Sequence, residues 1–293
     1  MLDPEALRGE FPVLERLAYL NAGTDGPLAT RAVEASREML ELEASEGRYR
    51  THFERRRELS NRLRAGYAAR LGAEPCDVAL TSCTSEGIAT VITGLDLGPD
   101  AEILTSDEEH PGLLHALEAA RELRGAQVRY APLPALADAV GPRTALVACS
   151  HVGWVSGLLA PAALRETGVP FLLDGAQGIG AVGVDVQALG CDYYSGAGQK
   201  WLCGPDGLGM LYVKPGQAEA IAATRRGFLA YEDGELHTDA RRLDAMAIPA
   251  EALALALAAL EILDRAGWPE VYTRAAALAA QLAEGLRERG REV

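Results

Sequence analysis

Short apolar segments that alternate with helix-like stretches constrain the fold of this chain more than any other feature of its sequence. Each segment is bounded by polar residues, glycine or proline, which is typical of buried strands. Several intervening stretches place apolar residues at helical spacing, for example 86–94, 113–123 and 160–167. Alternating strands and helices predict a mostly parallel sheet sandwiched by helices. The seven predicted strands are Val78–Ser82, Glu102–Ser106, Gln127–Ala131, Ala145–Val152, Phe171–Asp174, Tyr193–Gly196 and Gly209–Val213.

The segments on either side of this alternation are predicted to be helical. Residues 31–42 and 53–71 are rich in Arg and Glu and place apolar residues at helical spacing. After Pro215 the sequence becomes rich in alanine and predicts long helices over 249–266 and 269–289. We therefore expect the N-terminal helices to lie over the sheet and a helical C-terminal region to follow it.

Composition narrows the class of protein and the kind of partner. With 293 residues, 48% of them hydrophobic and 24% charged, the chain is suited to one large or two ordinary globular domains. Its 28 Lys and Arg against 42 Asp and Glu give a net charge of −14, which disfavours nucleic acid and anionic membrane surfaces. A small-molecule or protein partner is therefore expected.

The N-terminal sequence and the cysteines indicate a cytoplasmic protein. The chain starts without a basic segment followed by an apolar run, and no 18 consecutive residues are apolar, so neither a leader nor a membrane span is expected. The five cysteines are widely spaced and form no Cys-x-x-Cys pair. We therefore expect reduced thiols and no metal site.

Two residues near predicted strand ends are candidates for chemistry. Asp174 ends an apolar strand, at the sheet edge where α/β proteins bind ligands. Its carboxylate suits a metal, a sugar hydroxyl, a protonated ring nitrogen or a helix cap. Lys200, one of only two lysines, lies in the glycine-rich turn 195–205 beside Trp201. Such a lysine is either a solvated surface charge or, when partly desolvated, an amine that forms a Schiff base.

Two further groups follow predicted strands. Thr84 and Ser85 lie between a strand and a helix, where hydroxyls and backbone N–H groups bind phosphate or cap the helix. His110 follows another strand and suits a general acid, a ring-stacking partner or a polar loop residue. Together with Lys200 and Asp174, these groups fit one cofactor, pyridoxal 5′-phosphate (PLP).

Three segments are similar to a known family. Asp-Gly-Ala-Gln at 174–177, Gln-Lys-Trp-Leu-Cys-Gly-Pro at 199–205 and Gly-Leu-Gly-Met-Leu-Tyr-Val at 207–213 resemble the class V aminotransferase family of fold-type I PLP enzymes. That family includes cysteine desulfurases, cystine C–S lyases and isopenicillin N epimerase-like proteins. The resemblance extends from about Tyr19 to the predicted helix near Pro249. It implies an α/β fold of type I with a mostly parallel, seven-stranded sheet.

The resemblance also implies a role for each candidate residue. Lys200 would form the Schiff base with PLP and move the α-proton of the substrate, and Asp174 would pair with the pyridine nitrogen. His110 would stack on the ring and assist proton transfer. The other implied cofactor-binding residues are Thr84 and Ser85 for the phosphate, Gln177 for the ring oxygen, and Gln199 as a hydrogen-bond donor.

Three features depart from the desulfurase pattern. Ala197 and Gln199 stand where desulfurases have Ser and His, so one phosphate hydroxyl is absent. Trp154 stands where they have Asn, which favours the C–S lyase and epimerase-like branches. Family members also continue into a small α/β lobe that supplies an arginine for the substrate carboxylate. Arg48 or Arg50 is a candidate substitute for that arginine.

These observations predict three regions and a function. Residues 1–15 would form an N-terminal arm, 16–235 a PLP-binding large domain, and 236–293 the start of an incomplete C-terminal small domain. The predicted protein is a homodimeric enzyme that cleaves the C–S bond of a cysteine or cystine derivative by β-elimination. Alternatives are a cysteine desulfurase, an aminotransferase or an epimerase that uses the same quinonoid intermediate. A non-catalytic protein with the PLP-enzyme fold is an alternative of another class.

Overall fold

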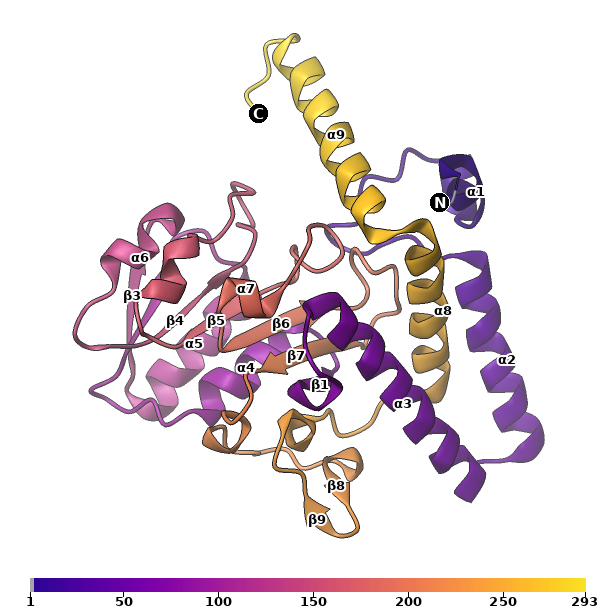
Figure 1. Cartoon of the computed structure of the whole chain (residues 1–293), viewed down its shortest axis with the longest axis horizontal. Coiled ribbons are helices and arrows are strands. Elements are labelled where there is room, and N and C mark those ends of the chain that lie inside the picture. Colours follow the sequence, from indigo (N-terminus) through magenta and orange to yellow (C-terminus); the bar gives the residue numbers. More distant parts are fainter. Residues whose placement is uncertain (1–2) are drawn as a thin grey trace.

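The centre of the molecule is a seven-stranded sheet with the strand order β1-β7-β6-β5-β4-β2-β3 (Figure 1). The computed structural model describes residues 3–293. Within the sheet, β7 pairs antiparallel with both β1 and β6, and the other ladders are parallel. The strands are β1 (Val78–Thr81), β2 (Glu102–Ser106), β3 (Gln127–Ala131), β4 (Thr144–Ser150), β5 (Phe171–Asp174), β6 (Tyr193–Ala197) and β7 (Gly209–Val213). This arrangement confirms the predicted mostly parallel sheet and all seven predicted strands.

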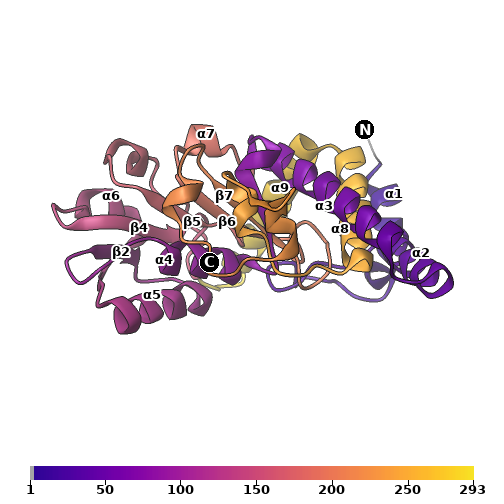
Figure 2. The same cartoon turned by 90° about the horizontal axis from the view of Figure 1, so that it is seen from below.

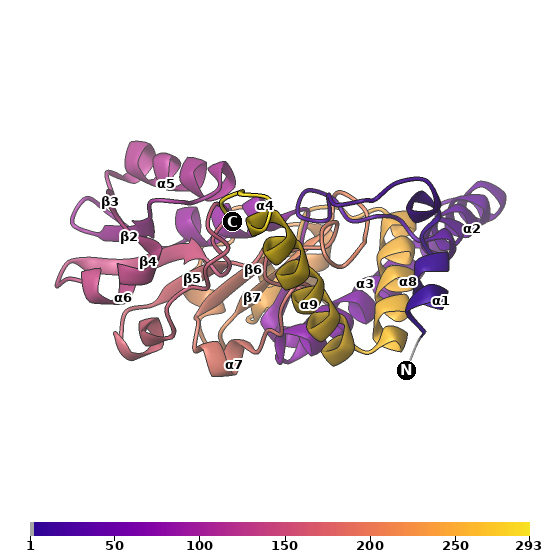
Figure 3. The ribbon, with the colours of Figure 1, turned by 90° about the horizontal axis from the view of Figure 1, so that it is seen from above.

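Helices cover both faces of the sheet, as Figures 2 and 3 show. Helices α4 and α5 pack on one face, and α3, α6 and α7 pack on the other. Buried strand residues alternate between the two cores: in β4, Leu146 and Ala148 face α4 and α5, whereas Val147 and Cys149 join the opposite core. The α-helices are α1 (Pro4–Gly9), α2 (Thr30–Glu46), α3 (Arg50–Leu71), α4 (Thr84–Gly94), α5 (Pro111–Arg124), α6 (Leu136–Ala139), α7 (Val186–Leu189), α8 (Ala250–Ala266) and α9 (Trp268–Arg287).

Local sequence signals explain where the helices begin and end. Helix α5 has Pro111 in its first turn, where the missing N–H costs nothing, and ends before Gly125, whose φ of 77° is left-handed. The prediction of an α-helix over 160–167 is wrong, because residues 162–166 form a short 3-10 helix. Pro161 and Gly168 bound this segment and leave too few residues for a stable α-helix.

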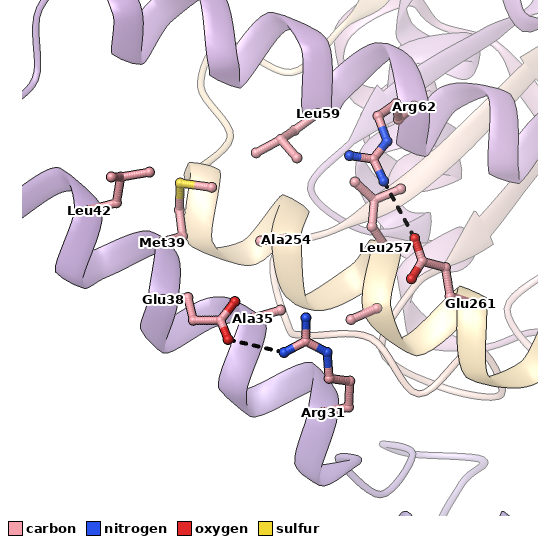
Figure 4. Close-up of a pocket in the computed structure, with 11 residues that line it drawn as sticks. Arg31, Ala35, Glu38, Met39, Leu42, Leu59, Arg62, Ala254, Leu257 and Glu261 are labelled. Atoms are coloured by element: carbon pink, nitrogen blue, oxygen red, sulfur yellow. Dashed lines mark hydrogen bonds and ion pairs between the residues drawn. The ribbon is translucent and has the colours of Figure 1, made fainter.

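Helices α2 and α3 both pack against α8 beside the sheet, and α9 projects away from it (Figure 1). Figure 4 shows a hollow between α2, α3 and α8 with apolar side chains such as Met39 on its walls. Two exposed ion pairs lie at this hollow: Arg31 with Glu38 within α2 at 3.1 Å, and Arg62 of α3 with Glu261 of α8 at 3.4 Å. None of the residues that line this hollow is a predicted site residue.

A buried ion pair connects distant parts of the chain. The Arg64 guanidinium in α3 bonds both carboxylate oxygens of Asp244, at 2.9 and 2.7 Å. Asp244 also accepts a hydrogen bond from the backbone N–H of Leu80 in β1 at 2.9 Å. The pair therefore fixes α3 and the segment that precedes α8 to the edge strand of the sheet. In residues 3–293, no helix is both long and apolar enough to cross a membrane.

Candidate functional site

The candidate residues gather at one edge of the sheet. Since β7 is antiparallel to both of its neighbours, β1 runs parallel to β6, and the carboxyl ends of β1, β2, β4, β5 and β6 lie at the same edge. Thr84, His110 and Lys200 lie just beyond three of these strands, and Asp174 ends β5. Ligands in open α/β sheets bind at this edge.

Asp174 is a buried acid that forms no ion pair with any residue of the described chain. Its Oδ1 accepts a hydrogen bond from the backbone N–H of Ala176 at 2.9 Å. Burial raises the pKa of Asp174, and the Ala176 N–H and the Lys200 charge oppose that shift. A buried carboxylate of this kind is stabilised in its charged form by a nearby cation, and a protonated ring nitrogen is one.

Lys200 is half-buried in the turn that follows β6. Burial lowers the pKa of its ammonium, while the charges of Asp174 and Asp25 raise it. In the part of the chain that the structure describes, the Lys200 Nζ makes no hydrogen bond or ion pair. A lysine with a lowered pKa and no partner is suited to act as a neutral amine.

The backbone around Lys200 is packed against an N-terminal segment. The Gly26 N–H donates to the carbonyl oxygen of Gln199 at 2.7 Å. A Cβ at Gly26 would overlap the backbone oxygen of Lys200, so only glycine allows this approach. Residues 19–27 were not predicted as part of the site. The two glycines in the segment Gly-Thr-Asp-Gly at 23–26 were the sequence feature that could have indicated a close backbone contact there.

The N-terminus of α4 has the features of an anion site. Thr84 is buried, and its Oγ1 has no hydrogen-bond partner within residues 3–293. The Ser195 hydroxyl in β6 donates to the Thr84 carbonyl at 2.9 Å, which anchors this end of the helix to the sheet. Cys83, the N-cap residue, caps no backbone N–H with its side chain. These free N–H groups and the Thr84 hydroxyl are suited to a phosphate.

His110 caps α5 and lies beside an aromatic side chain. Its Nδ1 accepts a hydrogen bond from the Gly112 N–H at 3.0 Å, so in the neutral ring the proton is on Nε2. Burial lowers the pKa of His110, and the charges of Lys200 and His115 lower it further. The imidazole meets the Trp154 ring edge-on, with 5.1 Å between centroids.

Glu109 holds the loop that carries His110, a role that the sequence analysis missed. Its buried carboxylate accepts hydrogen bonds from the Ser106 hydroxyl and from both the hydroxyl and the N–H of Ser150. It therefore ties the end of β2 to the end of β4. A serine at the end of the predicted strand 102–106 and another near the end of the predicted strand 145–152, with an acid beside His110, were the signal that could have revealed it.

Two glutamines differ in how their amides are used. Gln177 donates through Nε2 to the Gly23 carbonyl at 2.7 Å and accepts from Trp201 Nε1 at 2.9 Å, so both ends of its amide are engaged. By contrast, Gln199 Oε1 is buried and has no partner in the described residues. The sequence analysis named Trp201 only as a neighbour of the lysine and missed its contact with Gln177.

These side chains fit PLP in number and chemistry. The unpartnered buried atoms Thr84 Oγ1 and Gln199 Oε1 lie on two of the elements predicted to hold the cofactor. Buried polar atoms are almost always paired in native proteins, and a polar ligand at this edge would satisfy these two of the eight unpartnered buried side-chain atoms in the described residues. Asp174 and Lys200 add an unpaired acid and an unpaired amine. The individual role of each residue stays a prediction.

Comparison with known proteins gives a family match over most of the chain. The model of the family described as aminotransferase class-V matches residues 19–292. An isopenicillin N epimerase from Streptomyces clavuligerus is 31% identical over 80% of this chain and 62% of its own length. A probable cysteine desulfurase from Pseudomonas aeruginosa is 34% identical over 73% of this chain and 58% of its own. The chain thus spans about half to two thirds of the length of its curated relatives.

Solved structures agree with this match. A variant of C-DES with glycine covalently linked to the PLP cofactor superposes with a TM-score of 0.85 at 30% identity, covering 93% of this chain and 77% of the other. The cystine C–S lyase C-DES in complex with its product cysteine persulfide gives 0.84 at 30% identity, covering 90% and 76%. These neighbours confirm the predicted α/β fold of type I.

Proposed function

Because the chain belongs to the aminotransferase class-V family of PLP-dependent enzymes, we propose that it cleaves the carbon–sulfur bond of a cysteine or cystine derivative by β-elimination. The observation that carries the proposal is the half-buried, unpartnered Lys200 beside the buried Asp174 at the carboxyl edge of the sheet. When bound, PLP supplies an electron sink for the α-carbon of an amino acid. Elimination would convert cystine and one molecule of water to pyruvate, ammonia and thiocysteine.

Each residue at the site has a defined task in this proposal. The N-terminus of α4, with Thr84 and Ser85, binds the phosphate. Asp174 would pair its negative charge with the pyridine nitrogen, and His110 would cover the ring, with its Nε2–H available. Lys200 Nζ removes the α-proton of the substrate as a neutral amine, which its lowered pKa favours. Gln177 and Gln199 complete the contacts with the cofactor.

One sequence feature favours elimination over desulfuration. The chain has Trp154 where desulfurases have Asn, as in the C–S lyase and epimerase-like branches. Epimerisation is the second candidate, because two isopenicillin N epimerases are 31% and 34% identical to the chain.

Parallel incubations with L-cystine and with L-cysteine separate these reactions by their products. We expect the PLP-loaded protein to release pyruvate and ammonia in equal amounts from L-cystine. Alanine formed from L-cysteine would indicate desulfuration, and inversion of the amino acid without pyruvate would indicate epimerisation. Absence of all these products, in protein shown to hold PLP, would contradict enzymatic turnover and favour a non-catalytic protein.

The organisation of the protein is part of the same proposal. We propose a cytoplasmic homodimer with a large domain over 16–235 and a small domain that starts at 236. The substrate carboxylate needs a cation, and Arg48 and Arg50 are the candidates that the sequence offers, although the α2–α3 connection near which they lie is remote from the sheet (Figure 1). Arg48 pairs with the buried Glu43 at 2.6 Å, and Arg50 pairs with the exposed Glu54 at 2.8 Å. Arg50 is the freer of the two to bind a carboxylate.

A further inference from the structure

A short finger of residues 151–160 stands beside His110 at the carboxyl edge of the sheet. It leaves the end of β4 and folds back on itself, with hydrogen bonds from Gly153 N to Leu158 O at 2.7 Å and from Ala160 N to the carbonyl of its first residue at 2.9 Å. The turn is completed by Gly157, whose φ of 72° is left-handed. The finger is therefore an ordered hairpin.

The finger exposes several large apolar side chains that are close together in the sequence. Contiguous exposed apolar residues indicate a contact surface, whereas single ones are common on any protein. Four large apolar side chains on the finger are at least half exposed: Trp154 51%, Val155 74%, Leu158 50% and Leu159 58%.

Glu108 fixes the finger to the loop that carries His110. Its carboxylate accepts hydrogen bonds from the Ser156 N–H at 2.7 Å and from the Ser156 hydroxyl at 2.8 Å. Glu108 precedes His110 by two residues, and the adjacent Glu109 ties the same loop to β4. The finger and the His110 loop are thus joined by side-chain contacts as well as through the sheet.

Trp154 is the finger residue that reaches the candidate site. Its ring meets the His110 imidazole at 86° between planes, a favourable edge-to-face geometry, and half of the side chain is still exposed. His110 is the residue proposed to cover the cofactor ring. An open indole beside it provides apolar surface next to the place that an amino-acid substrate would occupy.

We propose that Trp154 is a specificity-determining residue, the apolar wall against which the substrate's side chain lies, and that Glu108 is the positioning residue that holds this wall. This inference rests on the proposed function and defines its substrate class as amino acids with an extended apolar or sulfur-containing side chain. Alanine, whose side chain is one methyl group, is too short to use the wall.

Binding of two unreactive amino acids tests the wall directly. L-Norleucine has an extended apolar side chain without a leaving group. The dissociation constants of L-norleucine and L-alanine are measured from the change in the visible band of the PLP-loaded protein. Trp154→Ala is expected to weaken norleucine binding about tenfold and to change alanine binding less than about twofold. Trp154→Phe should retain most of the norleucine affinity. Val155→Ala, on the same finger, is the matched control and should change neither constant.

Glu108 variants test the positioning role. Glu108→Ala is expected to lower the preference for norleucine over alanine, and Glu108→Gln to restore it, because the glutamine oxygen still accepts a bond from Ser156. If Trp154→Ala weakened the binding of both amino acids equally, or of neither, the proposed role of Trp154 would be wrong, while the proposed function would remain intact. Failure of the parent to bind any amino acid, although it holds PLP, would overturn the proposed function and the wall together.

Discussion

At the scale of single residues, burial sets the charge states at the carboxyl edge of the sheet. It raises the pKa of Asp174 and lowers the pKa values of Lys200 and His110. Each shift favours the neutral form of the group. A neutral amine and a neutral imidazole are what proton removal and ring stacking require, whereas the acid needs a cation to stay charged.

The charge of Asp174 can be removed with little change in shape. Asp174→Asn keeps the side-chain volume and the acceptor for Ala176, but it loses the negative charge that would face the pyridine nitrogen. We expect turnover of cystine to fall about 100-fold or more, because a fixed charge in a buried site contributes on that order. Asp185→Asn is the control, since asparagine replaces aspartate well as the N-cap of α7. Equal activity of the two variants would contradict the role of Asp174.

His151 predicts how stability depends on pH. It is buried against Tyr194, with Nδ1 3.0 Å from the hydroxyl, and burial lowers its pKa from 6.5 to about 4. The unfolded chain therefore binds a proton that the folded protein excludes, and stability falls as pH falls through the window from 6.5 to 4.

Urea unfolding of the cofactor-free protein at pH 7 and pH 5 measures this effect. From pH 7 to pH 5, the free energy of unfolding of the parent should fall by about 2 kcal/mol more than that of His151→Asn. This difference follows from the pKa shift of His151. Equal losses in both proteins would show that His151 does not exclude the proton.

At the scale of elements, the strands were predictable and the contacts between loops were not. The run Phe171–Leu173 is apolar at every position because both faces of the sheet are covered, and that pattern is visible in the sequence. The sequence of the finger at 151–160 shows no hydrophobic pattern typical of a helix or a strand. Its shape depends instead on a contact with Glu108 from another loop. Its first two residues were predicted as a continuation of β4, which ends at Ser150.

Gly26 tests whether the segment at 19–27 supports the Lys200 turn. Gly26→Ala places a methyl group against the backbone oxygen of Lys200 and should cost about 1–3 kcal/mol of unfolding free energy, as overpacking does. Gly98→Ala is the matched control, because nothing lies within 4 Å of a Cβ at that position. Urea unfolding compares the two variants with the parent. A Gly26→Ala protein as stable as Gly98→Ala would show that the segment does not pack against the turn.

At the scale of the whole molecule, the Arg64–Asp244 pair connects α3, β1 and the segment before α8. Asp244→Ala leaves a buried guanidinium unpaired and should destabilise the protein by about 3–5 kcal/mol in urea unfolding. Glu261→Ala breaks the exposed pair with Arg62 and should cost less than about 1 kcal/mol. Similar losses for both would mean that the buried pair does not hold these elements together.

The sequence predicted that the candidate residues lie at one edge of the sheet, but it did not predict the contacts that hold their loops in place. Lys200, Asp174, Thr84 and His110 follow strand ends, and the topology of a parallel sheet brings strand ends together. Glu109 was missed because its partners lie at the ends of two different strands, and such a contact exists only once the sheet has formed.

The central claim is that Lys200 holds PLP as a Schiff base, and the two lysines of the chain allow a matched test. The visible spectrum is recorded with added PLP for the parent, Lys200→Ala and Lys214→Ala, followed by borohydride reduction and identification of the labelled peptide. Lys214 lies at the end of β7 and pairs with Asp192 at 3.1 Å, so its variant is the control. We predict a reducible band in the parent and in Lys214→Ala, its loss in Lys200→Ala, and a label on Lys200. A band that persists in Lys200→Ala, or a label on Lys214, would contradict the account.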